Sequence, residues 1–173
     1  MAPTGPKMLN TANRKLVWVP TIANIAAPTA TELNAGVEIT CLVTAADFVL
    51  GVTSNETIND PAVCDDINSS VPLRANVEAS MNFFRFKDAA DDLGWTTFTE
   101  MGLQGYLVQR IGQIEDTERQ EDVPFVAADQ VQVYEAVTHD PRIMSPATAG
   151  YEKFGMTFSV ARKNERAVVA AGV

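Results

Sequence analysis

Leu73–Phe83 alternates apolar and polar residues without a break, and this alternation constrains the fold more than any other segment. Its apolar residues are Leu73, Ala75, Val77, Ala79, Met81 and Phe83, and its polar residues are Arg74, Asn76, Glu78, Ser80 and Asn82. Neighbouring side chains of a strand point to opposite faces, so this period of two predicts one buried and one solvated face. Because typical strands have only about five or six residues, we expect a long strand that helps to build a surface.

The chain that follows predicts a helix at Lys87–Met101 and a second strand at Gly105–Ile111. Three acidic residues near the start of the helix suit the positive end of its dipole: Asp88, Asp91 and Asp92. Gly94 and the Trp95-Thr96-Thr97 run have weak helix propensity, so we expect the helix to break or bend there.

The remaining regular segments are mostly strand-like. Pro28–Gly36 is the exception, because a capping threonine and a terminal glycine predict one or two helical turns. We expect strands at Arg14–Val19, Val37–Val43, Val123–Val126, Gln130–Val137 and, through the alternation of Phe154, Met156, Phe158 and Val160, near the end of the chain. About seven or eight strands with one main helix favour a mainly β fold, an antiparallel β-sandwich or barrel with one flanking α-helix.

Three segments are irregular. Met1–Asn13 contains Pro3, Gly5 and Pro6 and is expected to be a flexible N-terminal arm, with residues 14–173 forming a single domain. Thr44–Pro72 is rich in Asp, Asn, Ser and Thr, and we interpret it as an extended loop or long hairpin that leaves the body of the domain. Glu115–Asp122 lacks apolar residues, which predicts a solvated hairpin tip.

The charge disfavours two classes of function. The chain has 13 Lys+Arg against 22 Asp+Glu, a formal net charge of −9, so tight electrostatic binding to nucleic acid or to an anionic membrane is not expected. No window approaches the roughly 20 apolar residues of a membrane span. Met1–Asn10 lacks the apolar core of a signal peptide, so we expect the two thiols, Cys41 and Cys64, to be reduced. A Cys41–Cys64 bridge that forms after release from the cell is the alternative.

The sequence contains few candidate catalytic or metal-binding residues. His139 is the single histidine and lies in the proline-bounded loop His139–Arg142, where a surface role outweighs catalysis because no nucleophile setting accompanies it. One histidine and two separated cysteines are too few for a zinc site, and Asp60, Asp65 and Asp66 lack the spacing of an EF-hand. We predict no catalytic residue, no cofactor and no metal ion.

The order of several segments along the chain is similar to that of a known protein family. The segments that carry this resemblance are RKLVWVP (Arg14–Pro20), VEITCLV (Val37–Val43), ETINDPAVCDD (Glu56–Asp66), ANVEASMNFFRF (Ala75–Phe86), GYLVQRIG (Gly105–Gly112) and GMTFSVARKNERAVV (Gly155–Val169). Together with the arm that precedes them, they resemble the major tail tube protein of long-tailed, non-contractile bacteriophages.

The resemblance implies a structural virion protein made in the host cytoplasm. Such subunits assemble into hexameric rings, and the rings stack into a tube through which the genome passes without specific binding. The arm and the long loop would contact the neighbouring ring, and the sheets of adjacent subunits would join into a barrel. Expected partners are further copies of the chain and the tape measure, tail terminator and baseplate or tail tip proteins. The candidate inter-ring contacts are Phe48, Glu56, Asp60, Asp65 and Asp66.

Two further groups of residues acquire candidate roles from this resemblance. The polar face of Leu73–Phe83 is either the lumen wall, the seam between subunits or simply solvated: Arg74, Asn76, Glu78, Ser80 and Asn82. Arg162, Lys163 and Arg166 are either subunit contacts to the acidic loop or solvated charges.

Three alternatives stay open. The chain is also compatible with another phage ring component, such as a tail terminator or head–tail connector. A carbohydrate-binding or enzymatic β-sandwich is a second alternative, and the related tube of a contractile or secretion apparatus is a third.

Overall fold

A computed structural model describes residues 12–64, 66–67, 70–112, 119–144 and 150–171. Most of the predicted arm Met1–Asn13 therefore lies outside the described residues, as do Asp65 and the first half of the predicted tip Glu115–Asp122.

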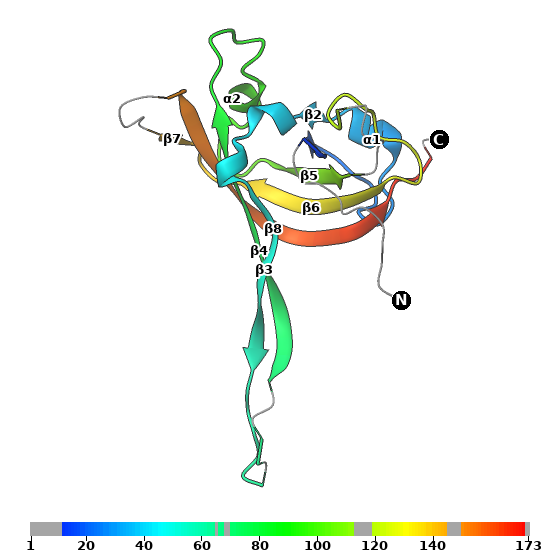
Figure 1. The fold of residues 1–173 in the computed structure, drawn as a ribbon, viewed down its shortest axis with the longest axis vertical. Helices are drawn as coiled ribbons and strands as arrows, with labels where there is room; N and C mark the ends of the chain where they lie inside the picture. The colour runs from blue at the N-terminus through cyan, green and yellow to red at the C-terminus, as the bar shows by residue number, and fades with distance from the viewer. Residues whose placement is uncertain (1–11, 65, 68–69, 113–118, 145–149, 172–173) are drawn as a thin grey trace.

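The strands of the described chain form one antiparallel sheet (Figure 1). In chain order they are β1 (Arg14–Val19), β2 (Val37–Glu38), β3 (Val49–Ile58), β4 (Val71–Phe84), β5 (Gln104–Ile111), β6 (Gln130–Thr138), β7 (Arg142–Met144) and β8 (Lys153–Val168). Their order in the sheet is β2-β1-β5-β6-β8-β4-β3, and β7 pairs with β8. The mainly β, antiparallel fold class is confirmed, with two short α-helices, α1 (Ala30–Asn34) and α2 (Leu93–Thr97).

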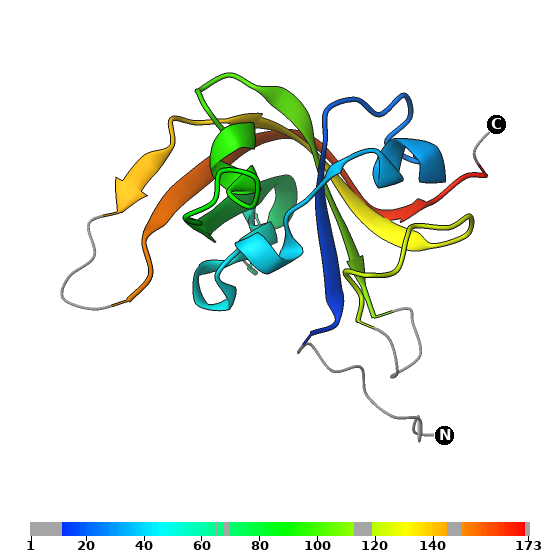
Figure 2. The same cartoon turned by 90° about the horizontal axis from the view of Figure 1, so that it is seen from above.

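The sheet carries an apolar cluster on each face. Leu16 and Trp18 of β1 belong to one cluster, whereas Val17 and Val19 belong to the other. Figure 2 shows α1 on one side of β1, and α2 with the short 3-10 helices η1 (Thr40–Leu42) and η2 (Ala45–Asp47) on the other side. Because both faces are covered here, β1 is a nearly continuous apolar run instead of an alternating one.

Helix α1 confirms the short helix predicted within Pro28–Gly36. Thr29 is its N-cap, and the Glu32 carboxylate accepts hydrogen bonds from the backbone N–H groups of Thr29 (2.8 Å) and Ala23 (2.9 Å). The bond from the Thr29 backbone is the main cause of a lowered Glu32 pKa. This reciprocal capping satisfies N–H groups that a helix start would otherwise leave unpaired.

The long helix predicted at Lys87–Met101 is wrong, because only Leu93–Thr97 is helical. Asp88 organises a turn instead: its carboxylate accepts from the N–H of Ala90 (3.0 Å), and its carbonyl accepts from Asp91 and Asp92. The helix forms where its propensity is weakest because Gly94 packs on the core. A Cβ atom at Gly94 would lie 2.9 Å from Cδ1 of Phe83, so only glycine fits without a shift.

The predicted strand Val37–Val43 is also mostly wrong. It is a strand only at Val37–Glu38 and then becomes η1, and at its end Val43 forms a single bridge with Phe83. Side chains replace the strand bonds here: the Thr40 hydroxyl accepts from the N–H of Leu16 (2.7 Å), and the Glu38 carboxylate accepts from the N–H of Thr40 (3.0 Å). Such local side-chain bonds compete with a sheet ladder.

Buried Arg110 explains two further corrections. Its guanidinium donates to the carbonyls of Gln120 (3.2 Å), Val123 (2.9 Å) and Pro124 (2.9 Å) and pairs with Asp129 (2.7 Å). Because these carbonyls bond to a side chain, the predicted strand Val123–Val126 is an irregular loop. Gln120, expected in a solvated tip, is buried. Separately, part of the predicted His139–Arg142 loop is strand β7, which starts at Arg142.

Candidate assembly surface

β3 and β4 form a hairpin that projects from the sheet (Figure 1). β4 pairs with β8 only from Ala79 to Phe84, whereas its first half, from Val71 to Glu78, pairs with β3 alone. At roughly 3.3 Å per residue, this half extends about 25 Å beyond the sheet. The interpretation of Thr44–Pro72 as a long hairpin that leaves the body is confirmed.

The apolar stripe of β4 continues beyond the core into solvent. Ala79, Met81 and Phe83 are buried as the alternation predicts. On the same face of the projecting half, however, Leu73 is 58% and Val71 55% exposed. Ile58 of β3 lies opposite Val71 and is itself 48% exposed. The expected buried face therefore exists in one half of the strand. In the other half Val77 still packs partly against the core, but nothing in the described chain covers Leu73 and Val71.

Exposed apolar side chains concentrate on this hairpin. Of the fourteen large hydrophobic residues exposed in the described chain, seven lie between Val49 and Leu73: Val49, Val52, Ile58, Val63, Ile67, Val71 and Leu73. Exposed apolar surface that gathers in one region typically marks an interaction site. We call this surface, with the acidic residues on it, the hairpin surface.

The predicted inter-ring residues divide between two places. Glu56, Asp60 and Asp66 are exposed along the hairpin, with Asp65 outside the described residues. Phe48, by contrast, is half-buried at the hairpin base, where the Arg14 guanidinium lies 5.3 Å from its ring centroid. The acids are thus on the hairpin surface and Phe48 is not.

The predicted lumen or seam residues lie along the opposite face of β4. Arg74, Asn76 and Glu78 are exposed on the projecting half, and Ser80 and Asn82 are half-buried where β4 joins the sheet. Ser80 pairs with exposed Thr157 of β8, so the polar face passes from the hairpin onto the sheet.

The predicted basic contacts lie on the second half of β8. Arg162 forms an ion pair with Glu135 of β6, and Lys163 pairs with Glu165 at 2.8 Å. Arg166 is exposed. Within one chain Arg162 and Lys163 pair locally, and this part of β8 pairs with β6 and not with the hairpin.

Strand β8 has an open edge that no sequence pattern predicted. The β4 ladder ends at Phe158, and from Ser159 to Ala167 no described strand pairs with that side of β8. At Val168 the backbone N–H donates to the carbonyl of Ala26 (3.4 Å), which closes the edge. Open strand edges are templates for pairing with another chain.

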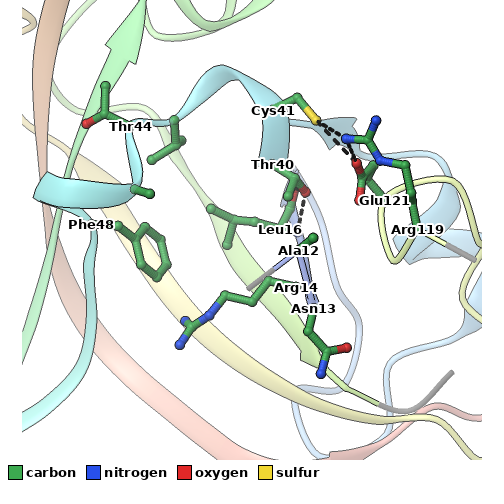
Figure 3. Close-up of a pocket in the computed structure, with 12 residues that line it drawn as sticks. Ala12, Asn13, Arg14, Leu16, Thr40, Cys41, Thr44, Phe48, Arg119 and Glu121 are labelled. Carbon is green, nitrogen blue, oxygen red and sulfur yellow. Dashed lines mark hydrogen bonds and ion pairs between the residues drawn. The ribbon is translucent and has the colours of Figure 1, made fainter. Parts of the chain in front are cut away.

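A groove near the hairpin base was also unforeseen. A cavity of about 470 Å³ lies between the start of β1, the η1–η2 segment and the loop at Arg119–Glu121. Figure 3 shows Arg14 and Phe48 at one end, and Cys41 with the Arg119–Glu121 ion pair at the other. A second cavity of about 230 Å³ adjoins it at Arg14 and Phe48 and follows β3 to Thr53. We call the two adjoining cavities the groove.

Cys41 lies in the wall of this groove. Its thiol donates to the Glu121 carboxylate (Sγ to Oε1, 3.6 Å), and an Arg119 nitrogen lies 3.9 Å from Sγ. Burial, followed by the negative charge of Glu121, raises the pKa of the Cys41 thiol. The thiolate, which is the nucleophilic form, is therefore disfavoured at neutral pH.

The structure offers little support for catalysis. His139 Nε2 lies 2.8 Å from the Ser159 hydroxyl, but both residues are exposed, and neither lines either cavity of the groove. No group of three or more His, Cys, Asp or Glu residues in the described ranges is placed to hold a metal ion. No helix among the described residues has the length and apolar character needed to span a membrane.

Comparison with known families decides the class of protein. The family model described as phage tail tube protein matches residues 1–173. The chain belongs to the phage tail tube protein family. No curated protein matches it. The resemblance drawn from the segment order is confirmed, and membership makes the chain a structural component of the virion tail that assembles into a tail tube with other phage proteins.

Proposed function

We propose that this chain forms hexameric rings that stack into the tail tube of a long-tailed, non-contractile bacteriophage. The tube is the conduit through which genome DNA passes during ejection. The observation that carries the proposal, beyond family membership, is the hairpin surface: an apolar stripe that continues the core about 25 Å beyond the sheet and has no cover within the described chain.

Open strand edges support ring formation. β3 is one end of the sheet, and from Ser159 to Ala167 one side of β8 is paired with no strand of the described residues. Joining the sheets of neighbouring subunits would pair such edges and build a continuous barrel around a lumen. Closure of this kind removes the aggregation hazard that an open edge poses.

The net charge suits a conduit for DNA. Six copies at −9 each would carry about −54 before counterions. Duplex DNA carries about one negative charge per 1.7 Å, so an acidic wall repels it and lets it slide. The polar face of β4, with Arg74, Asn76, Glu78, Ser80 and Asn82, is proposed as the lumen wall or the subunit seam.

Contacts between rings would involve the hairpin and the arm. We assign inter-ring contact to Phe48, Glu56, Asp60, Asp65 and Asp66, and contact between subunits to Arg162, Lys163 and Arg166. Tape measure, tail terminator and baseplate or tail tip proteins would complete the tail. Synthesis would take place in the host cytoplasm, before assembly into the virion.

Negative-stain electron microscopy of the purified chain tests the proposal. Long tubes with six-fold end views are expected. Isolated rings alone would favour a terminator or connector, and a monomer whose melting temperature rises with a saccharide would favour a carbohydrate-binding sandwich. A sheath gene beside the gene for this chain would assign the tube to a contractile or secretion apparatus.

Deleting residues 1–13 tests the arm separately. The truncated chain is expected to remain folded, with an unchanged circular dichroism spectrum, and to polymerise poorly. Tubes of normal length and yield from this variant would contradict a role of the arm in assembly.

A further inference from the structure

The groove at the hairpin base has the shape and charge of a receptor. Its apolar floor includes Leu16, Val43 and Phe48, and its ends carry Arg14 and Arg119. The larger cavity, at about 470 Å³, falls within the range of roughly 300–1,000 Å³ that is typical of specific binding pockets. A ligand for this groove should therefore offer apolar side chains flanked by negative charge.

The end of the hairpin has these properties. We define the hairpin end by five exposed residues, three apolar and two acidic: Ile58, Val63, Ile67, Asp60 and Asp66. Val63 and Ile67 are among the most exposed apolar residues of the described chain. We propose that the groove of one subunit receives the hairpin end of a second copy.

The hairpin end cannot fill the groove of its own chain. The groove lies at the base of the hairpin, along Val49–Thr53, and the hairpin runs away from it (Figure 1). With about 25 Å of two-stranded ladder between base and end, a return to the same groove would require β3 and β4 to separate. The contact therefore joins two different surfaces of two separate copies. Repeated head to tail, such a contact builds open or ring-shaped polymers, and an exchange of hairpins between only two copies would instead give a closed dimer.

Charge favours the hairpin end over the other candidate occupant. Residues 1–11 precede the groove wall at Ala12 and Asn13, but they carry Lys7 and no acidic residue. Two arginines already line the groove, and Glu121 is paired with Arg119. An acidic occupant is thus better matched electrostatically than a basic one.

This inference rests on the proposed function and names the receiving surface for its hairpin contact. A matched pair of substitutions in η2 tests it. Ala45 and Ala46 are adjacent and both exposed, but only Ala45 lines the groove. Ala45→Trp should fill the groove and abolish tube formation, whereas Ala46→Trp should form tubes like the wild type. Both variants should keep the wild-type melting temperature.

The two native cysteines supply an independent readout. Cys41 lies in the groove wall, and exposed Cys64 lies beside Val63 on the hairpin. In assembled tubes a short bismaleimide should therefore join Cys41 of one copy to Cys64 of the next, giving covalent multimers on a denaturing gel. Cys41→Ser and Cys64→Ser should each abolish these multimers.

The outcomes separate this inference from the proposed function. Tubes from Ala45→Trp at wild-type yield, or multimers that survive Cys41→Ser, would overturn the groove assignment and leave the tail tube proposal intact. A wild-type chain that forms no tubes would overturn the proposed function, and the groove assignment would fall with it.

Discussion

The two halves of β4 share one alternating pattern but have different surroundings. From Ala79 to Phe84 the strand pairs with β8, and its apolar side chains are buried in a cluster that includes aromatic rings of β8 and of α2. From Val71 to Glu78 it pairs with β3 alone, and on the same face Val71 and Leu73 are exposed, whereas Val77 is partly buried against the core. An alternating pattern thus predicts that one face of a strand will be covered, but it does not predict whether the same chain or a second molecule covers it.

The buried half should govern folding, and Phe83→Ala should have the largest effect. Phe83 is fully buried, and its ring stacks on Phe154 with centroids 5.1 Å apart. Removing a buried phenylalanine ring costs about 3–5 kcal/mol through lost burial and the cavity left behind. Urea denaturation of the monomer should show this loss, and fewer tubes should form because a larger fraction of the subunits is unfolded.

Phe84→Ala is the matched control, because Phe84 is the next residue and lies half-buried on the opposite face. Its loss should cost about 1–2 kcal/mol. Equal losses from the two variants would show that the two faces of this half do not differ as described.

The projecting half should govern assembly instead. The double substitution Val71→Ser with Leu73→Ser removes two exposed apolar side chains, so monomer stability should change by no more than about 0.5 kcal/mol. Tubes should nevertheless be lost, because the stripe that a second copy would cover is gone. Electron microscopy and thermal melting of the same sample separate the two effects.

Val126→Ser controls for a general effect of removing exposed apolar residues. Val126 is exposed on the body of the domain, away from the hairpin. This control should form tubes normally. Tubes from the Val71→Ser, Leu73→Ser variant as well would mean that the projecting half has no role in assembly.

Predictions from the sequence were correct for elements whose structure is determined by residues adjacent in the chain. The strand at Arg14–Val19 and the Thr29 cap of α1 follow from neighbouring residues, and both were predicted correctly. The helix at Lys87–Met101 was wrong because the Asp88 turn and the fit of Gly94 against Phe83 outweigh propensity.

The candidate site could be predicted only in part. A projecting segment with Glu56, Asp60 and Asp66 was foreseen, because acids without apolar partners do not enter a core. The groove was not, because its walls come from three segments that only the fold brings together, around Arg14, Phe48 and Glu121. The open edge of β8 depends on where β4 leaves the sheet, which strand patterns do not encode.

A weaker effect on assembly is expected from the acids of the hairpin surface. Replacing Glu56, Asp60 and Asp66 by their amides keeps size and removes three exposed negative charges. Ring stacking should weaken and lose much of its dependence on ionic strength, since salt screens such exposed charges. Light scattering across a salt series measures this. A large fall in the melting temperature of the monomer would instead place these acids in the folding of the body.

The smallest effect is expected at Glu32, in the body and remote from the hairpin. Hydrogen bonds from backbone N–H groups, chiefly that of Thr29, lower the folded-state pKa of Glu32 below its unfolded value. The ionised carboxylate therefore stabilises the fold above the unfolded pKa, and this contribution disappears as pH falls through the folded pKa. Glu32→Gln should cost about 0.5–1 kcal/mol at pH 7. The difference in stability between Glu32→Gln and the wild type should shrink toward zero in acid.

Glu100→Gln, at an exposed residue, is the control and should change stability little at either pH. Because the lost interaction lies within the body, tubes of Glu32→Gln should form normally at pH 7, and a loss of tubes without a loss of stability would contradict the division between the two halves of β4.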